Sequence, residues 1–545
     1  MTTNFTLKQE AYLKAISKGT TIQAAIPLAL MYGLVFLPVT ASILPITTQD
    51  PLSACIIFAI FLFIMAIIFV LHYNFSIWII NKFLKVKWVK INDLPVDCQI
   101  FINNSCNTLK LNIPVIGIIE TNDPNAFTYG NKNRPIIVLT SGLLEILTPQ
   151  EANAVIAHEL GHVYHRDFIF MMMAAIVPMI LGYTTWQCVK FSRSDKISAI
   201  LLPLAFVLGL FYLCSKLLIA KISRDREYKA DQFAGFLIGN PNTLATALLK
   251  ITSKSSVFKR HGQATLNSLE RGEARQVRRR LAQLQSAALL GIASDSIGAE
   301  TKSSALLAMS WELSNVWAKW YEIRSTHPLS AKRIQHLLGQ AKSFGISPSF
   351  IISSKKGKFG PFALEFIVKF SSIIAYYIAY SSLLTFDMEL QYSFFGLIIF
   401  LLLITIILLE IGLSYSNKFT SFSITDLLSN VEASLTRSIP TSLSGVLKFE
   451  NPGNDWSRIF IQEDENMIEI KIPKLNFGKR EQLESLNLCR ISIKGWYRRD
   501  PNPVFQLSFV NNYNENKKIE FFQSGFLLRK IAVLLLIIAC LRAIF

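Results

Sequence analysis

Long apolar runs alternate with polar segments along this chain, and the pattern predicts a polytopic membrane protein. A helix needs about 20 apolar residues to cross a bilayer. Six runs reach that length, at 22–46, 52–71, 168–189, 197–215, 365–386 and 393–414. A seventh run, 526–545, is interrupted by Arg529, Lys530 and Arg542. The sequence leaves open whether this last run spans the bilayer or lies in its interface.

The polar segments between these runs predict two water-facing regions. Segments 81–167 and 216–363 together form the first, and the second of them has a mainly helical pattern. Segment 415–525 contains short alternating runs such as "MIEIKI", separated by Asn, Pro and Gly, which predict a β-rich module of about 100 residues. Within it, "ISIKGWYRRDPNPVFQL" resembles an OB-like, GIDE-type β domain of membrane proteins.

Composition agrees with a membrane protein, because 51% of the residues are hydrophobic and only 17% are charged. The net charge of +18 is spread over the non-membrane segments, which indicates topology and contact with lipid headgroups. We therefore expect no nucleic-acid partner. The seven cysteines are scattered without a C-x-x-C pair, so a metal site would have to use histidines and carboxylates.

Basic residues near the apolar runs predict the orientation of the chain. Lysines precede the first run and follow the second, whereas the turns at 47–51 and 387–392 contain none. This places the large polar segments in the cytoplasm. The loop 190–196, "KFSRSDK", contradicts the rule. Either the rule fails there, or 168–215 is a hairpin held partly within the protein.

Local signals place the chemistry on a helix. "RPIIVLT" (134–140) predicts a short strand. The following Thr148-Pro149-Gln150-Glu151 is a strong helix start, with a Thr cap, Pro at the first helical position and Glu at the third. The stretch "AVIAHELGHVYHRD" (154–167) is therefore helical and runs toward the third apolar segment.

Two histidines in this stretch have the spacing of metal ligands. His158 and His162 are four residues apart, so they lie on one helix face about 6 Å apart along the axis and can share one zinc ion. Glu159 points away from both, near enough to hold a water. His165 lies about 10 Å along the axis from His158, too far to join a metal at bonds of about 2 Å. It is not expected to be a ligand.

A third ligand must come from elsewhere on the same side of the membrane. The chain after His162 crosses two apolar runs and returns to "ISRDREYKADQFAG" (222–235). Glu227 and Asp231 are four residues apart there. One carboxylate could bind zinc and the other could accept a hydrogen bond from a ligating imidazole. The alternative is a solvated charged helix that emerges from the bilayer.

Four ordered motifs resemble the M48 metallopeptidases, a family that includes the HtpX-type membrane proteases and the Ste24-type CAAX proteases. They are "NAFTYG" (125–130), "HELGH" followed by Asp167, "SRDREYKAD" (223–231) and "THPLSAKRI" (326–334). The resemblance implies one zinc ion per chain, bound by His158, His162 and Glu227, with Glu159 as general base.

The resemblance also implies supporting roles. Asp231 and Asp167 would orient ligands, and Asn125 and Ala126 would hold the substrate backbone beside an edge strand at 135–140. His327 and Arg333 would lie near the cleft and stabilise the developing oxyanion, and Arg333 would also bind substrate. The other interpretation of His327 is a loop histidine that caps a helix.

Together these observations predict a mainly α fold. Transmembrane hairpins are expected at 1–80, 168–215 and 364–414, a gluzincin-like HExxH zinc peptidase domain at 81–167 and 216–363, a β-rich domain at 415–525 and an apolar segment at 526–545.

The expected function is cleavage of peptide bonds in membrane or membrane-proximal proteins, as part of their quality control, with the active site on the cytoplasmic side of a bacterial inner membrane. Partners would be polypeptides and lipid, and the oligomeric state is left open. A proteolytically silent chaperone or scaffold is the main alternative. A transport protein is disfavoured because the apolar runs contain almost no charge.

Overall fold

The computed structural model describes most of the chain as two compact units. The described residues are 26, 28–33, 50–83, 86–131, 133–192, 195–268, 302–354, 357–384, 394–449, 458–472, 479–500, 502–512, 517–521 and 523–544. The first unit runs up to Ser255 and resumes at Tyr321–Ile351, and the second includes 302–320 and everything described from Ile352 onward. Residues 302–320, expected in the peptidase domain, thus belong to the second unit.

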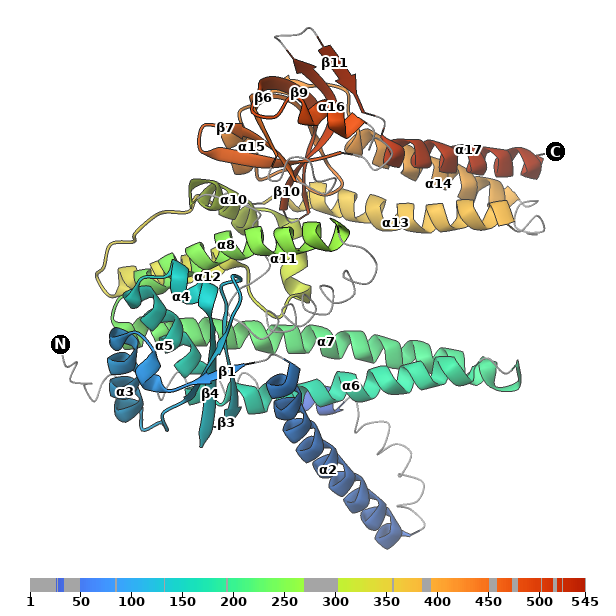
Figure 1. Cartoon of the computed structure of the whole chain (residues 1–545). Coiled ribbons are helices and arrows are strands. Elements are labelled where there is room, and N and C mark those ends of the chain that lie inside the picture. The colour runs from blue at the N-terminus through green and yellow to red at the C-terminus, as the bar shows by residue number, and fades with distance from the viewer. Residues whose placement is uncertain are drawn as a thin grey trace. The chain divides into compact units, whose positions relative to one another are not determined.

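The polar part of the first unit contains a four-stranded sheet (Figure 1). Its strands are β1 (Lys87–Val89), β2 (Val115–Ile119), β3 (Ala126–Asn131) and β4 (Arg134–Thr140), in the order β1-β2-β4-β3. The predicted strand at 134–140 is therefore present, but the prediction that it forms an edge is wrong. β4 pairs on one side with β2 and on the other with β3, which is the outer strand.

The β3–β4 hairpin explains why a glycine ends the "NAFTYG" motif. Gly130 has φ +94°, a left-handed conformation in which a Cβ would lie 2.5 Å from the carbonyl oxygen of Arg134. Only glycine adopts this turn without strain. The turn lets the outer strand fold back along β4.

The predicted active-site helix is α5 (Pro149–His165), and its start is the expected one. The Thr148 hydroxyl accepts a hydrogen bond from the Glu151 amide, and the Glu151 side chain accepts one from the Thr148 amide. This reciprocal cap satisfies amides that have no partner within the helix. The neighbouring elements are α3 (Val96–Leu109), α4 (Ser141–Ile146) and a short 3₁₀ turn, Ile91–Asp93.

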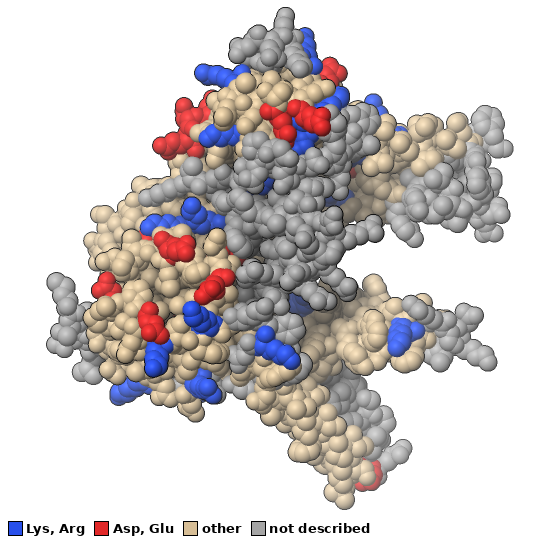
Figure 2. All heavy atoms as spheres, in the orientation of Figure 1, with Lys and Arg blue, Asp and Glu red and all other residues tan. Residues whose placement is uncertain are grey.

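Three long helices of the first unit have membrane character. They are α2 (Pro51–Phe83), α6 (Asp167–Phe191) and α7 (Asp195–Ile238). The last two pack together as a hairpin, and α7, at 44 residues or about 66 Å, extends well beyond one bilayer thickness. Figure 2 shows few charged atoms along the projecting parts of these helices.

Five described helices are long and apolar enough to cross a membrane, and they match five of the six predicted runs. They contain Pro51–His72, Asp167–Phe191, Ser198–Ile238, Phe359–Tyr376 and Leu397–Ser414. Most of the sixth run, 22–46, lies outside the described residues.

Two more helices of the first unit follow α7 in the chain. They include α8 (Pro241–Ser268), of which the part up to Ser255 belongs to this unit, and α12 (Ser330–Ser343), which packs on α7. The predicted helical character of the 216–363 segment is confirmed among its described residues.

In the second unit, three helices pack side by side: α13 (Phe359–Leu384), α14 (Phe394–Ser414) and α17 (Ser524–Ile544) (Figure 1). They share a buried apolar cluster that includes Phe400, Leu403 and Leu536. The bundle carries more charge than the apolar runs suggested. Glu410, 1% exposed, contacts Lys369 and Arg529, so the arginine that interrupts the last run is paired inside the bundle.

The predicted β-rich module is a barrel. Its strands are β6 (Ile439–Phe449), β7 (Ile459–Glu463), β8 (Asn466–Lys471), β9 (Arg490–Asp500) and β10 (Asn502–Asn512). Each pairs with the next in the order β6-β7-β8-β10-β9, and β9 pairs back with β6. A closed ring of five strands is consistent with the OB-like resemblance.

Shorter elements complete the second unit. They are β5 (Thr420–Ser421), β11 (Lys517–Glu520), α10 (Lys302–Ser314), α15 (Ile424–Ser429), α16 (Arg480–Glu484) and α11 (Val316–Arg324), whose last residues belong to the first unit. The barrel core is apolar and includes Leu443, Ile461 and Phe505.

Candidate metal centre

The two histidines of α5 face a carboxylate from α7. His158 Nε2 lies 3.1 Å from His162 Nε2 and 3.6 Å from Glu227 Oε2, and His162 Nε2 lies 3.7 Å from Glu227 Oε1. Tetrahedral bonds of about 2.05 Å would separate ligand atoms by about 3.4 Å, so these distances fit one zinc ion. His158, His162 and Glu227 could therefore hold a metal.

Glycine at position 161 allows α7 to come this close. A Cβ there would lie 3.1 Å from a ring carbon of Phe233 and 3.3 Å from the Ala230 Cα. The middle of "HELGH" is thus a contact point between α5 and α7. Because α7 is one continuous helix, this contact fixes the height of Glu227 beside the two imidazoles.

The second nitrogen of each imidazole faces a carboxylate. His158 Nδ1 lies 3.0 Å from Asp231 Oδ1, and His162 Nδ1 lies 2.6 Å from Asp167 Oδ2. Such a partner holds the proton on Nδ1 and leaves Nε2 free to bind a metal. The structure therefore places Asp231 and Asp167 where residues that orient the ligands are expected.

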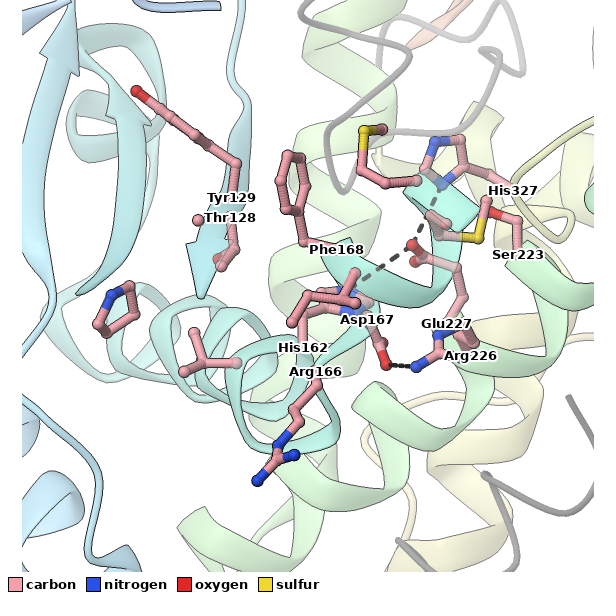
Figure 3. A pocket seen from close by; sticks show the side chains of 16 residues that line it. Thr128, Tyr129, His162, Arg166, Asp167, Phe168, Ser223, Arg226, Glu227 and His327 are labelled. Carbon is pink, nitrogen blue, oxygen red and sulfur yellow. Dashed lines mark hydrogen bonds and ion pairs between the residues drawn. The ribbon is translucent and has the colours of Figure 1, made fainter. Parts of the chain in front are cut away.

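Two arginines hold these carboxylates in place. Arg333 donates from Nε and Nη2 to Asp231, at 2.8 and 2.7 Å, and its Nη1 lies 3.0 Å from Glu227 Oε2. Arg226 pairs with Asp167 (Figure 3) and also donates to the His165 carbonyl. The side chains of Arg226, Arg333 and Asp231 are each 3% exposed or less, and those of Glu227 and Asp167 are 8% exposed. The carboxylates cannot easily leave the histidines.

These contacts change the interpretation of Arg333. The sequence resemblance placed it near the cleft as a substrate-binding residue, but it is 1% exposed and bound to Asp231 and Glu227. Its position does not support contact with substrate. Its guanidinium instead joins α12 to the two carboxylates of α7.

Burial and charge set the protonation of the histidines. Burial alone would lower the pKa of His158, but Asp231 and Glu227 outweigh it and raise the pKa to about 9. Burial lowers the pKa of His165 to about 4, and its ring packs against Tyr164 and Phe233. His165 is therefore a neutral core residue and is not part of the metal-holding group, as its distance along the helix predicts.

Glu159, the expected general base, has a partner that the sequence did not single out. Thr128 on β3 donates a hydrogen bond from its hydroxyl to Glu159 Oε2 at 2.6 Å. Glu159 is 1% exposed, so this contact helps to fix its carboxylate. Thr128 is part of "NAFTYG", but the spacing of residues along a strand could not show that its side chain faces α5.

His327 lies beside the third candidate ligand. Its Nδ1 is 3.4 Å from Glu227 Oε1, and both residues line one pocket together with His162 (Figure 3). His327 thus contributes to the site itself, whereas a loop histidine that only capped a helix need not face Glu227.

Asn125 and Ala126 lie at the beginning of β3, away from this pocket. Asn125 is 4% exposed and Ala126 is 0% exposed. The backbone N–H of Asn125 donates a hydrogen bond to the Thr140 hydroxyl at 2.8 Å. This ties the start of β3 to the end of β4. The residues of β3 that line the pocket are Thr128, Tyr129 and Gly130, so the predicted role of Asn125 and Ala126 in binding substrate backbone gains no support from their position.

The chain thus combines helices long and apolar enough to cross a membrane with a group of two H-E-x-x-H histidines and a distant glutamate that could hold a metal. A family model, "Peptidase family M48", matches residues 104–341. "Protease HtpX" of Legionella pneumophila subsp. pneumophila is 32% identical over 198 residues, which are 34% of this chain and 70% of that protein. The chain belongs to peptidase family M48.

Other relatives match over shorter stretches. "Protease HtpX homolog" of Methanothermobacter thermautotrophicus is 39% identical over 144 residues, 26% of this chain and 54% of that protein. "Protease HtpX homolog 1" of Streptomyces coelicolor is 38% identical over 147 residues, 26% of this chain and 48% of that protein. The chain thus spans about half the length of these relatives.

The chain was also compared with a solved structure, "Crystal Structure of S. mikatae Ste24p". The matched region is 58% of this chain and 66% of that one, and the two sequences are 16% identical. Its TM-score of 0.29 is too low to carry an argument about fold. The family match ends at residue 341, before α13, so the barrel strands and the helices α13, α14 and α17 lie outside that match.

Proposed function

We propose that this protein is a zinc-dependent endopeptidase that cleaves membrane or membrane-proximal proteins. The observation that supports it best is the meeting of His158, His162 and Glu227 within 3.1–3.7 Å, with Glu159 beside them. Membership of a peptidase family agrees with it.

The chain's own residues supply most of the proposed mechanism. Zinc held by the three ligands would act as a Lewis acid and make water acidic enough to lose a proton near neutral pH. Glu159 would take that proton as the water attacks a peptide carbonyl and deliver it to the departing amine. Thr128 would hold Glu159, and His327 is the residue we propose for stabilising the developing oxyanion.

The outer strand suggests how substrate binds. β3 pairs only with β4 among the described strands, so its other edge can pair with an extended peptide. Main-chain pairing recognises shape more than sequence, which suits a protease with many substrates in quality control of membrane proteins. From the basic residues near the spans, we place this site in the cytoplasm of a bacterium, at its inner membrane.

Two variants of the full-length protein in detergent test this proposal. Glu159→Gln should retain zinc but lose at least about 100-fold in cleavage of a disordered substrate such as casein, because general base catalysis contributes that much or more. Glu227→Ala should lose zinc as well. Exposed Glu145 provides a matched control, since Glu145→Gln should change neither quantity. If Glu159→Gln cleaves as fast as the parent, the mechanism is wrong.

The main alternative is a proteolytically silent scaffold that keeps the fold. The same assay separates the two, because a scaffold would contain zinc in the parent protein without cleaving casein. Transport is the third possibility, and ion or solute flux in liposomes tests it. The contacts of Glu410 with Lys369 and Arg529 compensate charge inside the bundle and are not evidence for a transport pathway.

A further inference from the structure

A pocket with a cavity volume of about 140 Å³ opens beside the metal centre. Its lining includes His162, Glu227 and His327 on one side and β3 residues Thr128 to Gly130 on another. It therefore touches both the candidate metal group and the strand on which substrate is proposed to lie (Figure 3). A side chain next to the scissile bond would have this pocket within reach.

The walls of the pocket are mainly apolar. Phe168, Met171 and Met172, from the first two turns of α6, form one side, and Tyr129, Pro135 and Val163 contribute from the sheet and α5. Methionine is flexible and polarisable, so it adapts to different apolar shapes. The pocket thus lies where a candidate membrane span joins the active-site helix.

Charges around the pocket are compensated or directed elsewhere. Asp167 pairs with Arg226 and with His162, and Arg166 is an exposed residue. The guanidinium of Arg166 points away from Glu227 and His327 (Figure 3), so a substrate carboxylate or ammonium placed beside those residues would lose its water next to charges that are already paired, which is costly. The pocket therefore favours an uncharged side chain.

We propose that this pocket is the specificity subsite of the protease, and that it accepts one large apolar side chain, such as Leu, Met or Phe, next to the scissile bond. The proposal rests on the proposed function. The volume of the pocket is close to that of an engineered cavity of about 150 Å³ that binds benzene. A phenyl ring or a branched aliphatic side chain would therefore fill the pocket. Met172, one of the two methionines in its lining, is the residue proposed to limit the size of that side chain.

The test uses the full-length protein in detergent and a mixture of peptides of defined sequence, with cleavage sites identified by mass spectrometry. Leu, Met and Phe should be enriched at one of the two positions that flank the cut bond. In peptides that vary only there, replacing Leu with Ala or Asp should lower kcat/KM by at least about 10-fold, because each missing methylene costs about that much or more.

Two variants then locate the subsite. Met172→Trp should fill the pocket, reverse the preference so that Ala exceeds Leu and Phe, and leave zinc content unchanged. Met179, 45% exposed on the same helix, provides the control, because Met179→Trp should retain the parent's preference.

The possible outcomes separate the two proposals. No cleavage of any peptide by the zinc-loaded parent would contradict the proposed function. Cleavage without an apolar preference, or an unchanged preference in a zinc-containing Met172→Trp, would overturn the subsite while leaving the protease intact. If Met172→Trp loses its zinc, Met172→Phe is tested in its place. That variant must show the same shift of preference toward smaller side chains, or the subsite is overturned.

Discussion

Replacing Asp231 with Asn would remove one charge from the centre of the site while keeping the shape of the side chain. Asp231 accepts two hydrogen bonds from Arg333 and lies 3.0 Å from His158 Nδ1. The amide of Asn can donate as well as accept. It would therefore allow the His158 tautomer that carries its proton on Nε2, the atom expected to bind zinc.

The size of the effect follows from these contacts. Loss of a residue that orients a metal-bound histidine lowers metal affinity about 10–100-fold, which corresponds to about 1.4–2.7 kcal/mol. Removing one partner of a buried ion pair costs about 3–5 kcal/mol of stability. Arg333 would retain its contact with Glu227 at 3.0 Å. We therefore expect a loss at the lower end, about 3 kcal/mol.

Competition with a zinc-binding dye measures the affinity, and unfolding of the metal-free protein in detergent measures the stability. Asp225→Asn, on the same helix but partly exposed, is the matched control and should leave both near the parent's values. If Asp231→Asn binds zinc within about twofold of the parent, Asp231 does not orient His158, and the proposed support of the metal site is refuted.

Three further predictions follow from single contacts. Thr128→Val removes the hydroxyl that binds Glu159 and should lower kcat about 10-fold at unchanged zinc content, since one hydrogen bond to a charged group contributes about 1.5 kcal/mol or more. Thr128→Ser keeps a hydroxyl and should retain most of the parent's rate. A Thr128→Ser variant as slow as Thr128→Val would contradict this role of the hydroxyl. Gly161→Val should push α7 away from α5 and reduce zinc content measured by mass spectrometry, so full zinc occupancy in that variant would show that close approach is unnecessary. Glu410→Ala leaves Arg529 buried without its carboxylate partner and should lower the unfolding temperature in detergent. The double variant Glu410→Ala with Arg529→Leu should recover part of that loss. Equal unfolding temperatures of the single and double variants would show that the pair is not coupled.

The sequence by itself determined the features that depend on short-range spacing. Thr148-Pro149 predicted the start of α5, and a separation of four residues predicted that His158 and His162 share one face. The crossing of two apolar runs predicted that segment 222–235 returns to the side of those histidines, and the resemblance to M48 singled out Glu227, which lies 3.6 and 3.7 Å from them. The start of the helix, the shared face and the return of the chain to one side follow from helix geometry or from the length needed to cross a bilayer, and none of the three requires knowing which distant residues pack together.

Only the tertiary structure decided which partners meet across the chain. It made β4 an inner strand and β3 the outer one, because pairing order is set by the whole sheet and not by any strand's own pattern. It brought Thr128 to Glu159 and buried Arg333 against Asp231, 102 residues away in sequence. The pocket beside Met172 likewise exists only where α5, α6 and β3 meet. Such contacts depend on packing between elements, which local periodicity does not encode.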